Sequence, residues 1–326
     1  DWKNTAVKKL TSGLFSLAKR RQISVIRGTA QFQDRHTLIV EGENSSVITF
    51  ENAIVAAGSR PVRLSVFPDD KRVMYSTQAL KLEDVPPKLL IVGAGIIGLE
   101  MATLYAALGS RVTVIEVAET ILPMARSGAR PLQMALKKSC EAIWTSTRVT
   151  AATVEDEGIR VSFEGPKAPK TAVFDKILVS VGRIPNSDCI SAAAAGVETD
   201  DLGYIKTDNR CRTSASNIFA IGDISGPPML AHKASMEGRI AAEVLAGHDV
   251  APVTKVIPSV AYTTPEVAWV GKMQDTEEAA GTQRIARFPF AANARALTLD
   301  ESAGGIQLMF DRSEEHTSEL QSLLII

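Results

Sequence analysis

The sequence has few cysteines, and they lie far apart. Cys140, Cys189 and Cys211 form neither a CxxC pair nor a cluster with the spacing of metal ligands. We therefore expect no metal site, and no two of these cysteines have the spacing of a redox-active pair. The pattern is typical of a protein in the reducing environment of the cytoplasm.

The chain is also nearly neutral and has no long apolar run. It has 36 basic and 37 acidic residues, so its formal net charge of -1 creates no overall field that would attract nucleic acid or a membrane. No apolar run approaches the ~20 residues that span a bilayer, and no signal peptide stands at the start. With 45% apolar and 22% charged residues among 326, the composition predicts a soluble globular protein of two or three domains.

Local patterns alternate between helix and strand signals. An amphipathic helix is expected over residues 2–21, and alternating β-branched segments predict short strands between residues 23 and 57. A linker, LEDVPPK, is followed by an apolar strand at 88–92, a glycine loop, a helix that ends before Gly109 and the strand RVTVIE. A second helix is expected to end before Gly247.

One short pattern occurs twice in the same register. FENAIVAAGSRP at 50–61 and FDKILVSVGRIP at 174–185 share Phe, a four-residue apolar run, Gly and Pro at one constant offset. Each copy closes a predicted β-meander, and the two meanders resemble each other almost turn for turn. The duplication indicates two domains of related design.

The stretch IVGAGIIGLE has the GxGxxG spacing of a dinucleotide-binding loop. A strand precedes it, a helix follows it, and the next strand ends in Glu116, near the ~20-residue spacing expected of the acidic residue. Gly93 permits a tight turn, Gly95 lets the backbone approach a pyrophosphate, and Gly98 lets helix and strand pack closely. A glycine turn without a ligand is the alternative, which this complete context disfavours. The rest of the predicted loop consists of Ala94, Ile96 and Ile97.

Glu116 favours NAD over NADP. A carboxylate accepts hydrogen bonds from both hydroxyls of the adenine ribose and repels a 2′-phosphate. The next nine residues, VAETILPMA, contain no Arg or Lys to receive such a phosphate.

A second site is expected where the strand of SNIFAIGDISG delivers Gly222 and Asp223 to its carboxyl end. A carboxylate there can hold a ribitol or ribose hydroxyl, and the N-terminus of the helix that begins near Ala231 can stabilise negative charge on a reduced flavin. An ordinary exit from a strand into a turn is the alternative. His232, at the start of the same helix, is assigned no chemistry.

Several ordered segments together resemble the FAD-dependent pyridine nucleotide-disulfide oxidoreductases, and within them the dihydrolipoamide dehydrogenase group. The resemblance runs from about residue 1 to 311 and rests on ENAIVAAGSRP, LLIVGAGIIGLEMATLYAALGSRVTVIE, VSVGRIPN, IFAIGD with MLAHKASMEG, and VIPSVAYTTPEVAWVG. It implies an α/β fold with two Rossmann-like FAD- and NAD(P)-binding domains of the three-layer ββα type and the start of an α+β dimerisation domain. The implied parts are 1–86 and 188–254 for FAD, 87–187 for NAD and 255–311 for the truncated dimerisation domain.

The resemblance also implies roles for individual residues. Asp223 would hold the flavin ribitol, Ala231 would present a backbone amide to the flavin, and Gly58 would lie where the first meander returns to it. Ala30 would contact the FAD adenine through its backbone, and Glu100 would pair with a lysine beside the flavin. On the NAD side, the implied residues are the glycine loop, Glu116, Val149 and Gly182.

The resemblance implies a reaction in which electrons pass from a dithiol substrate to an active-site disulfide, then to FAD and finally to NAD. The implied partners are a second copy of the chain and the lipoyl domain of 2-oxoacid dehydrogenase complexes. We expect no catalytic residue inside this chain, because the CxxxxC pair and the first GxGxxG loop would lie before Asp1 and the His and Glu base pair after Asp311. A polypeptide of this length is therefore expected to fold poorly, to bind little FAD and to lack turnover.

The last residues abandon the preceding β pattern. RSEEHTSELQS resembles the translation of a sequencing adapter read in frame, so residues 312–326 are expected to be a non-native tail without an evolved fold, with a genuine polar tail as the alternative.

Other functions stay open: another disulfide reductase, a soluble transhydrogenase, a mercuric reductase or NADH oxidase relative, or a non-catalytic dinucleotide-binding module. A GxGxxG followed by CxxxxC in the upstream DNA would distinguish an enzyme from such a module.

Overall fold

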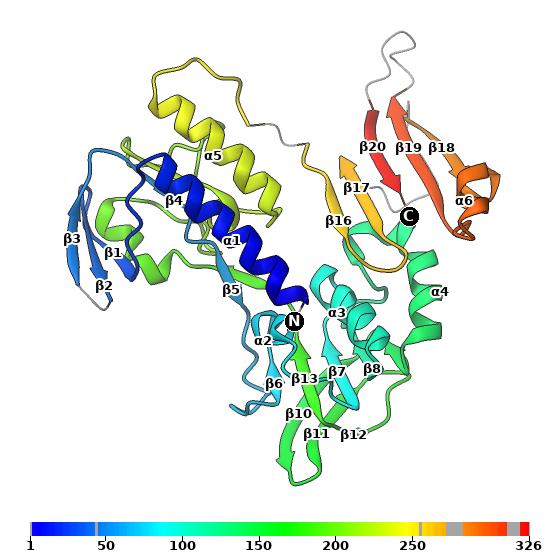
Figure 1. Ribbon diagram of the computed structural model, residues 1–326. Helices are drawn as coiled ribbons and strands as arrows, with labels where there is room; N and C mark the ends of the chain where they lie inside the picture. Colours follow the sequence, from blue (N-terminus) through cyan, green and yellow to red (C-terminus); the bar gives the residue numbers. More distant parts are fainter. Residues whose placement is uncertain (1, 43–44, 254–255, 272–282, 312–319, 326) are drawn as a thin grey trace.

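The computed structural model describes residues 2–42, 45–253, 256–271, 283–311 and 320–325. It contains a central domain built on a parallel sheet and a C-terminal antiparallel sheet (Figure 1). A third, flanking part consists of residues that come before and after the central domain in the sequence. This mixed α/β architecture confirms the expected fold class.

The central domain is a five-stranded parallel sheet covered by helices on one face and by a β-meander on the other. In sheet order, its strands are β6 (Val73–Met74), β13 (Lys176–Val179), β7 (Lys88–Val92), β8 (Arg111–Ile115) and β9 (Ala142–Trp144). The helices are α2 (Ser76–Lys81), α3 (Ile96–Ala107), η1 (Pro123–Gly128) and α4 (Ala129–Ser139). The meander consists of β10 (Arg148–Glu155), β11 (Gly158–Glu164) and β12 (Thr171–Phe174).

Strand β7 shows how the apolar sequence builds this layered core. Leu89 and Ile91 belong to the buried cluster on the helix side, whereas Leu90 and Val92 belong to the cluster on the meander side. Successive side chains of a strand point to opposite faces, so a strand covered on both faces needs a continuous apolar run. The run LLIV meets this requirement.

The flanking part combines residues from before and after the central domain. Strand β4 pairs in parallel with β15, which joins the two segments, and the expected helix at the start of the chain is confirmed as α1. Of the described residues of α1, none is buried. The strand expected from Ile23 begins only at Thr29. The elements are α1 (Trp2–Arg20), β1 (Thr29–Asp34), β2 (Thr37–Glu41), β3 (Ser46–Thr49), β4 (Ala53–Val55), η2 (Asp188–Ile190), η3 (Ala192–Ala195), β15 (Ile218–Ala220), η4 (Gly222–Ser225) and α5 (Ala231–Leu245).

The two copies of the duplicated sequence pair with each other. Their ends form a two-stranded antiparallel ladder in which the backbone N–H of Val62 donates to the carbonyl of Gly182 at 3.0 Å, and that of Asn186 donates to Gly58 at 3.1 Å. Equivalent residues thus exchange equivalent hydrogen bonds about a local two-fold axis. The strands are β5 (Ser59–Pro61) and β14 (Arg183–Pro185).

The C-terminal part is an antiparallel sheet that packs against the central domain. Ala261, Val267 and Trp269 belong to the same buried cluster as the helix side of the central sheet. In sheet order, its strands are β16 (Ser259–Ala261), β17 (Val267–Gly271), β20 (Leu320–Ile325), β19 (Gly305–Asp311) and β18 (Gln283–Pro289), and its short helices are η5 (Phe290–Ala292) and α6 (Ala294–Thr298).

Two segments differ from the expected organisation. Strand β6 and helix α2 lie in the central domain although they precede residue 87, because Val73 and Met74 are buried beside β13. Strand β20 comes from the tail that was expected to lack a fold, since the segment LQSLLI is apolar enough to pair between β17 and β19. Residues 312–319 of that tail lie outside the described residues, and its adapter origin stays a prediction.

Candidate dinucleotide-binding site

The glycine loop connects β7 to α3, and its three glycines meet different demands. Gly93 has a φ of +102°, and a Cβ there would lie 2.5 Å from the carbonyl oxygen of Ser180. A Cβ on Gly98 would lie 1.9 Å from the carbonyl oxygen of Gly93. Gly95 has open space around its missing side chain. Two glycines are therefore required by packing, and the third leaves room for a ligand at the N-terminus of α3.

Glu116 follows β8 and is held against this loop. Its Oε2 accepts a 2.7 Å hydrogen bond from the N–H of Ala94, and its Oε1 accepts a 2.9 Å bond from the N–H of Ala118. Each carboxylate oxygen has two lone pairs, so both oxygens keep capacity for ribose hydroxyls. The sequence pattern gave no sign of the bond to Ala94.

A cavity of about 770 Å³ brings the NAD-side residues together. This volume lies within the range of about 300–1,000 Å³ that is usual for ligand and cofactor sites. Ala94 and Gly98 are buried and do not line the cavity. The predicted residues that do line it are Gly93, Gly95, Ile96, Ile97, Glu116, Val149 and Gly182.

The cavity also has walls that the sequence motifs did not indicate. It extends to Pro227–Leu230, directly before α5, so it joins the Glu116 end to the start of the helix that was assigned to the flavin. Arg148 lines it as well, with its Nε 2.8 Å from Glu164 Oε2. Arg148 comes from β10 and not from the segment after Glu116, so the lack of Arg and Lys in VAETILPMA gave no sign of it. Further lining residues are Met124, Ser180, Val181, Arg183, Ser259 and Trp269.

Asp223 lies where the first duplicated copy meets the second. Ser59 donates a 2.6 Å hydrogen bond to Asp223 Oδ2, and Arg183 Nε lies 3.9 Å from the same oxygen. The Asp223 side chain is 26% exposed, and within the described part of the chain its Oδ1 has no hydrogen-bond partner. A carboxylate with one oxygen anchored and the other available fits a ribitol hydroxyl. Gly58, with a φ of +67°, directly precedes Ser59, and its expected place beside the flavin stays a prediction.

The remaining predicted residues lie on three separate elements. Ala30 is part of β1 in the meander at one side of the molecule (Figure 1), and Ala231 is the exposed first residue of α5. The N-cap of α5 has no side-chain hydrogen bond, so the first amides of this helix are not capped by its own N-cap residue. Glu100 Oε1 accepts a 2.9 Å hydrogen bond from the N–H of Tyr262 in the C-terminal part. The roles implied for these residues stay predictions.

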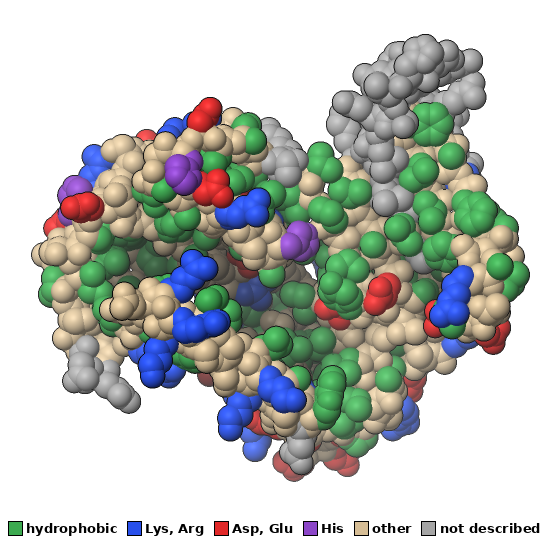
Figure 2. All heavy atoms as spheres, turned by 45° about the horizontal axis from the view of Figure 1, so that its top comes forward, with side chains coloured by type: hydrophobic (Ala, Val, Ile, Leu, Met, Phe, Trp, Pro, Cys, Tyr) green, Lys and Arg blue, Asp and Glu red, His purple; other side chains and the backbone are tan. Residues whose placement is uncertain are grey.

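The space-filling view shows one face of the molecule hollowed, with hydrophobic side chains in the hollow and Lys and Arg side chains near its rim (Figure 2). Such a distribution suits a ligand with an apolar ring system and negative phosphates. It is a local feature of this face, because the chain as a whole is nearly neutral.

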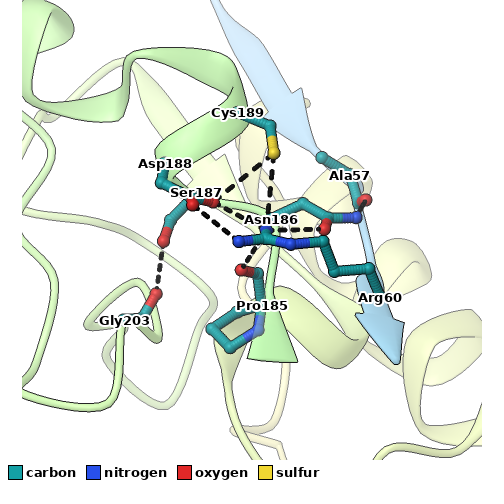
Figure 3. Close-up of polar contacts among 8 residues, drawn as sticks. All are labelled: Ala57, Arg60, Pro185, Asn186, Ser187, Asp188, Cys189 and Gly203. Carbon is teal, nitrogen blue, oxygen red and sulfur yellow. Dashed lines mark hydrogen bonds and ion pairs between the residues drawn. The ribbon is translucent and has the colours of Figure 1, made fainter. Parts of the chain in front are cut away.

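Arg60 ties the β5–β14 junction to the segment that follows it (Figure 3). Its guanidinium donates to both carboxylate oxygens of Asp188, at 2.8 and 2.7 Å, and to Asn186 Oδ1 at 3.2 Å. The hydrogen bonds from Arg60 lower the pKa of Asp188 to about 2. Asn186 in turn donates to the carbonyl of Ala57 at 2.8 Å, so both copies are held by side chains as well as by backbone.

The three cysteines are all free thiols, and none lines the cavity. Cys140 and Cys211 are buried, and burial raises the pKa of both thiols, that of Cys211 to about 12. Cys189 is exposed beside Asp188. Within the described ranges, no group of three or more His, Cys, Asp or Glu side chains could hold a metal ion. The helices in the described part of the chain are all too short or too polar to cross a membrane.

Comparison with protein-family models defines the class of this chain. Residues 3–238 match the pyridine nucleotide-disulphide oxidoreductase model, and residues 257–317 match the dimerisation domain of the same family. The chain belongs to the pyridine nucleotide-disulphide oxidoreductase family, whose members use FAD and a nicotinamide dinucleotide.

Individual relatives narrow the comparison. Dihydrolipoyl dehydrogenase of Vibrio parahaemolyticus is 47% identical over 315 residues, which are 95% of this chain and 66% of the relative. The Geobacillus stearothermophilus enzyme of the same name is 40% identical over 96% of this chain and 67% of its own length. The chain thus spans about two thirds of the curated relatives that it matches.

Solved structures agree with this fold. The Cu(II) complex of the HOCl-induced flavoprotein disulfide reductase RclA from Escherichia coli superposes with a TM-score of 0.89 at 26% identity, over 99% of this chain and 73% of that one. LpdA from Mycobacterium tuberculosis gives a TM-score of 0.87 at 25% identity, over 98% of this chain and 71% of that one.

Proposed function

We propose that this chain supplies the nucleotide-binding domains of a dihydrolipoyl dehydrogenase, which oxidises protein-bound dihydrolipoamide and reduces NAD⁺. The observation that carries the proposal is the continuous cavity from Glu116 to Leu230, which ends at the start of α5 near the turn that carries Asp223. The identity of 47% to an enzyme of this name supports the same assignment.

The residues of the chain would bind and orient two cofactors. Glu116 would accept the hydroxyls of the NAD ribose, and the glycine loop would offer backbone N–H groups to the pyrophosphate. Asp223, anchored by Ser59, would accept a ribitol hydroxyl of FAD. When bound, FAD supplies two-electron transfer between a dithiol and the nicotinamide. The part of the protein would be to hold and orient both cofactors through the residues at the junction of β5, β14 and α5.

The partners follow from the same assignment. The C-terminal sheet, which matches a dimerisation domain, would join two copies of the complete protein. The lipoyl domain of a 2-oxoacid dehydrogenase complex would deliver the dithiol, and the cytoplasm would be the place of reaction.

The test uses the complete protein, expressed from a gene that includes the coding DNA on both sides of this sequence. Its FAD content is measured by absorbance, and NAD⁺ reduction is followed with dihydrolipoamide as the electron donor. In parallel assays, oxidation of NADH is followed with glutathione disulfide or oxygen as the electron acceptor. We expect about one FAD per chain and turnover that depends on dihydrolipoamide. Preferential turnover of glutathione disulfide or oxygen would assign another member of the family.

A non-catalytic dinucleotide-binding module is the second candidate, because the described residues bring together binding groups and no redox-active cysteine pair. Tight NADH binding without FAD and without turnover in the complete protein would support that module and contradict the enzyme.

A further inference from the structure

Helix α5 carries two ion pairs at i,i+4 spacing in opposite environments. Lys233 and Glu237 are 5% and 6% exposed, with Nζ and Oε1 3.0 Å apart. Arg239 and Glu243 form the second pair at 3.8 Å, and the Arg239 side chain is 84% exposed. An exposed pair costs little to form, whereas a buried pair must overcome the desolvation of two charges. The buried pair therefore needs an explanation beyond the stability of its own helix.

Both members of the buried pair reach out of α5 into the turn η4. Glu237 Oε2 accepts a 2.7 Å hydrogen bond from the N–H of Gly222, and Lys233 Nζ donates to the carbonyl of Gly222 at 3.0 Å. Lys233 also donates to Ser225 Oγ at 3.2 Å. The pair thus holds both polar backbone groups of Gly222 and the far end of the same turn.

The conformation of Gly222 needs such support. Its φ is +76°, and glycine populates positive and negative φ almost equally, so the residue type alone does not fix the turn. The next residue, Asp223, has its carboxylate anchored by one hydrogen bond from Ser59 and a 3.9 Å ion pair with Arg183. The direction of the Asp223 side chain therefore depends on how Gly222 is held.

We propose that Lys233 and Glu237 are positioning residues for Asp223: they clamp the Gly222 peptide groups and so aim the carboxylate at the flavin ribitol. This inference rests on the proposed function, because it assigns the ribitol as the target of Asp223. Neither residue touches the cofactor in this account, and both act through the turn η4.

The rival explanation is that the pair serves only general stability. Replacing a buried ion pair with apolar side chains of similar size is often neutral or stabilising, whereas removal of one partner leaves an uncompensated charge. A double replacement therefore separates the two explanations. Lys233→Met with Glu237→Leu removes the clamp, and Lys233→Met with Glu237→Gln keeps an acceptor for the Gly222 N–H.

The experiment compares these double variants in the complete protein with wild type and with the exposed-pair control Arg239→Met/Glu243→Leu. The measurements are FAD retained after dialysis, the FAD dissociation rate, hydrogen exchange of residues 220–226 and the melting temperature. For the Met/Leu variant we expect a melting temperature close to wild type, at least tenfold faster FAD dissociation and at least tenfold faster exchange of the turn. The Met/Gln variant should recover much of both losses, and the control should match wild type.

Two results would overturn the inference. Wild-type FAD retention and turn protection in the Met/Leu variant would show that the clamp is unnecessary, and collapse of both double variants would show a general structural role. If wild type itself holds no FAD, the proposed function fails, while hydrogen exchange of the Gly222 turn still decides whether the pair clamps it.

Discussion

Arg183 Nε donates a 2.7 Å hydrogen bond to the hydroxyl of Ser59, its counterpart 124 residues earlier in the duplicated sequence. The two copies pair through their backbones because they share one pattern, but this side-chain bond exists because they have diverged at this position. Ser59 also donates to Asp223, so Arg183 connects the wall of the cavity at Glu116 to the carboxylate that we assign to the flavin.

Replacement of Glu116 by Arg should weaken NADH binding strongly. The variant loses a charged acceptor for the ribose hydroxyls and the bond that holds the Ala94 amide. A loss of at least about 2 kcal/mol is expected, on the order of thirtyfold in Kd. Fluorescence titration with NADH and NADPH checks this, with Glu157→Arg on an exposed turn as control. Unchanged affinity for both nucleotides would refute the role of Glu116.

Alanine at two glycines of the loop should have opposite consequences. Gly98→Ala places a methyl group 1.9 Å from the Gly93 carbonyl oxygen, so it should destabilise the domain by about 1–3 kcal/mol. Gly95→Ala meets open space in the free protein, so stability should hold while NADH affinity falls. Chemical unfolding and NADH titration of both variants measure the difference. Equal effects of the two substitutions on stability would contradict the assignment of Gly98 to packing and of Gly95 to nucleotide binding.

The Arg60–Asp188 pair should contribute a small, pH-dependent stabilisation. The pKa of Asp188 is lowered to about 2 in the folded chain. This stabilisation is therefore complete above the unfolded pKa of about 4 and disappears as the pH falls through about 2. Because the Asp188 side chain is 63% exposed, the effect should stay below about 1 kcal/mol.

Asp188→Asn tests this in unfolding experiments between pH 7 and pH 2, with the exposed Asp201→Asn as control. The difference from wild type should be constant from pH 7 to pH 5 and shrink below pH 4. A difference that grows on acidification would show that the sign is wrong.

Thiol labelling of the native chain should modify one cysteine. Cys189 is exposed, whereas Cys140 and Cys211 are buried. With its pKa near 12, the Cys211 thiol should be ionised at pH 8 to the order of one part in ten thousand. Of these three thiols, Ellman's reagent should therefore react quickly only with that of Cys189, and with the other two only after unfolding. Cys189→Ser should abolish the fast phase, and a second fast thiol would count against this burial pattern.

Local sequence determined much of the fold and of the proposed NAD-binding loop. The run LLIV, the spacing of Gly93 to Gly98 and the position of Glu116 specify a buried strand, a tight loop and an acidic residue within one βαβ unit. Gly109 and Gly247 mark helix ends, and both have positive φ values in the structure. These features depend on backbone geometry over a few residues, so a single sequence is sufficient to reveal them.

Tertiary structure decided the relationships between segments that are distant in the chain. It paired the ends of the two duplicated copies, brought Arg148 and Leu230 into the cavity of Glu116, and placed strand β20 between β17 and β19. It also turned Lys233 and Glu237 inward onto Gly222, although their spacing alone equally suits a solvent-exposed helix pair such as Arg239 and Glu243. The spacing of residues along a helix determines which side chains are neighbours. Only the packing of that helix decides whether these side chains face water or contact a turn of the backbone.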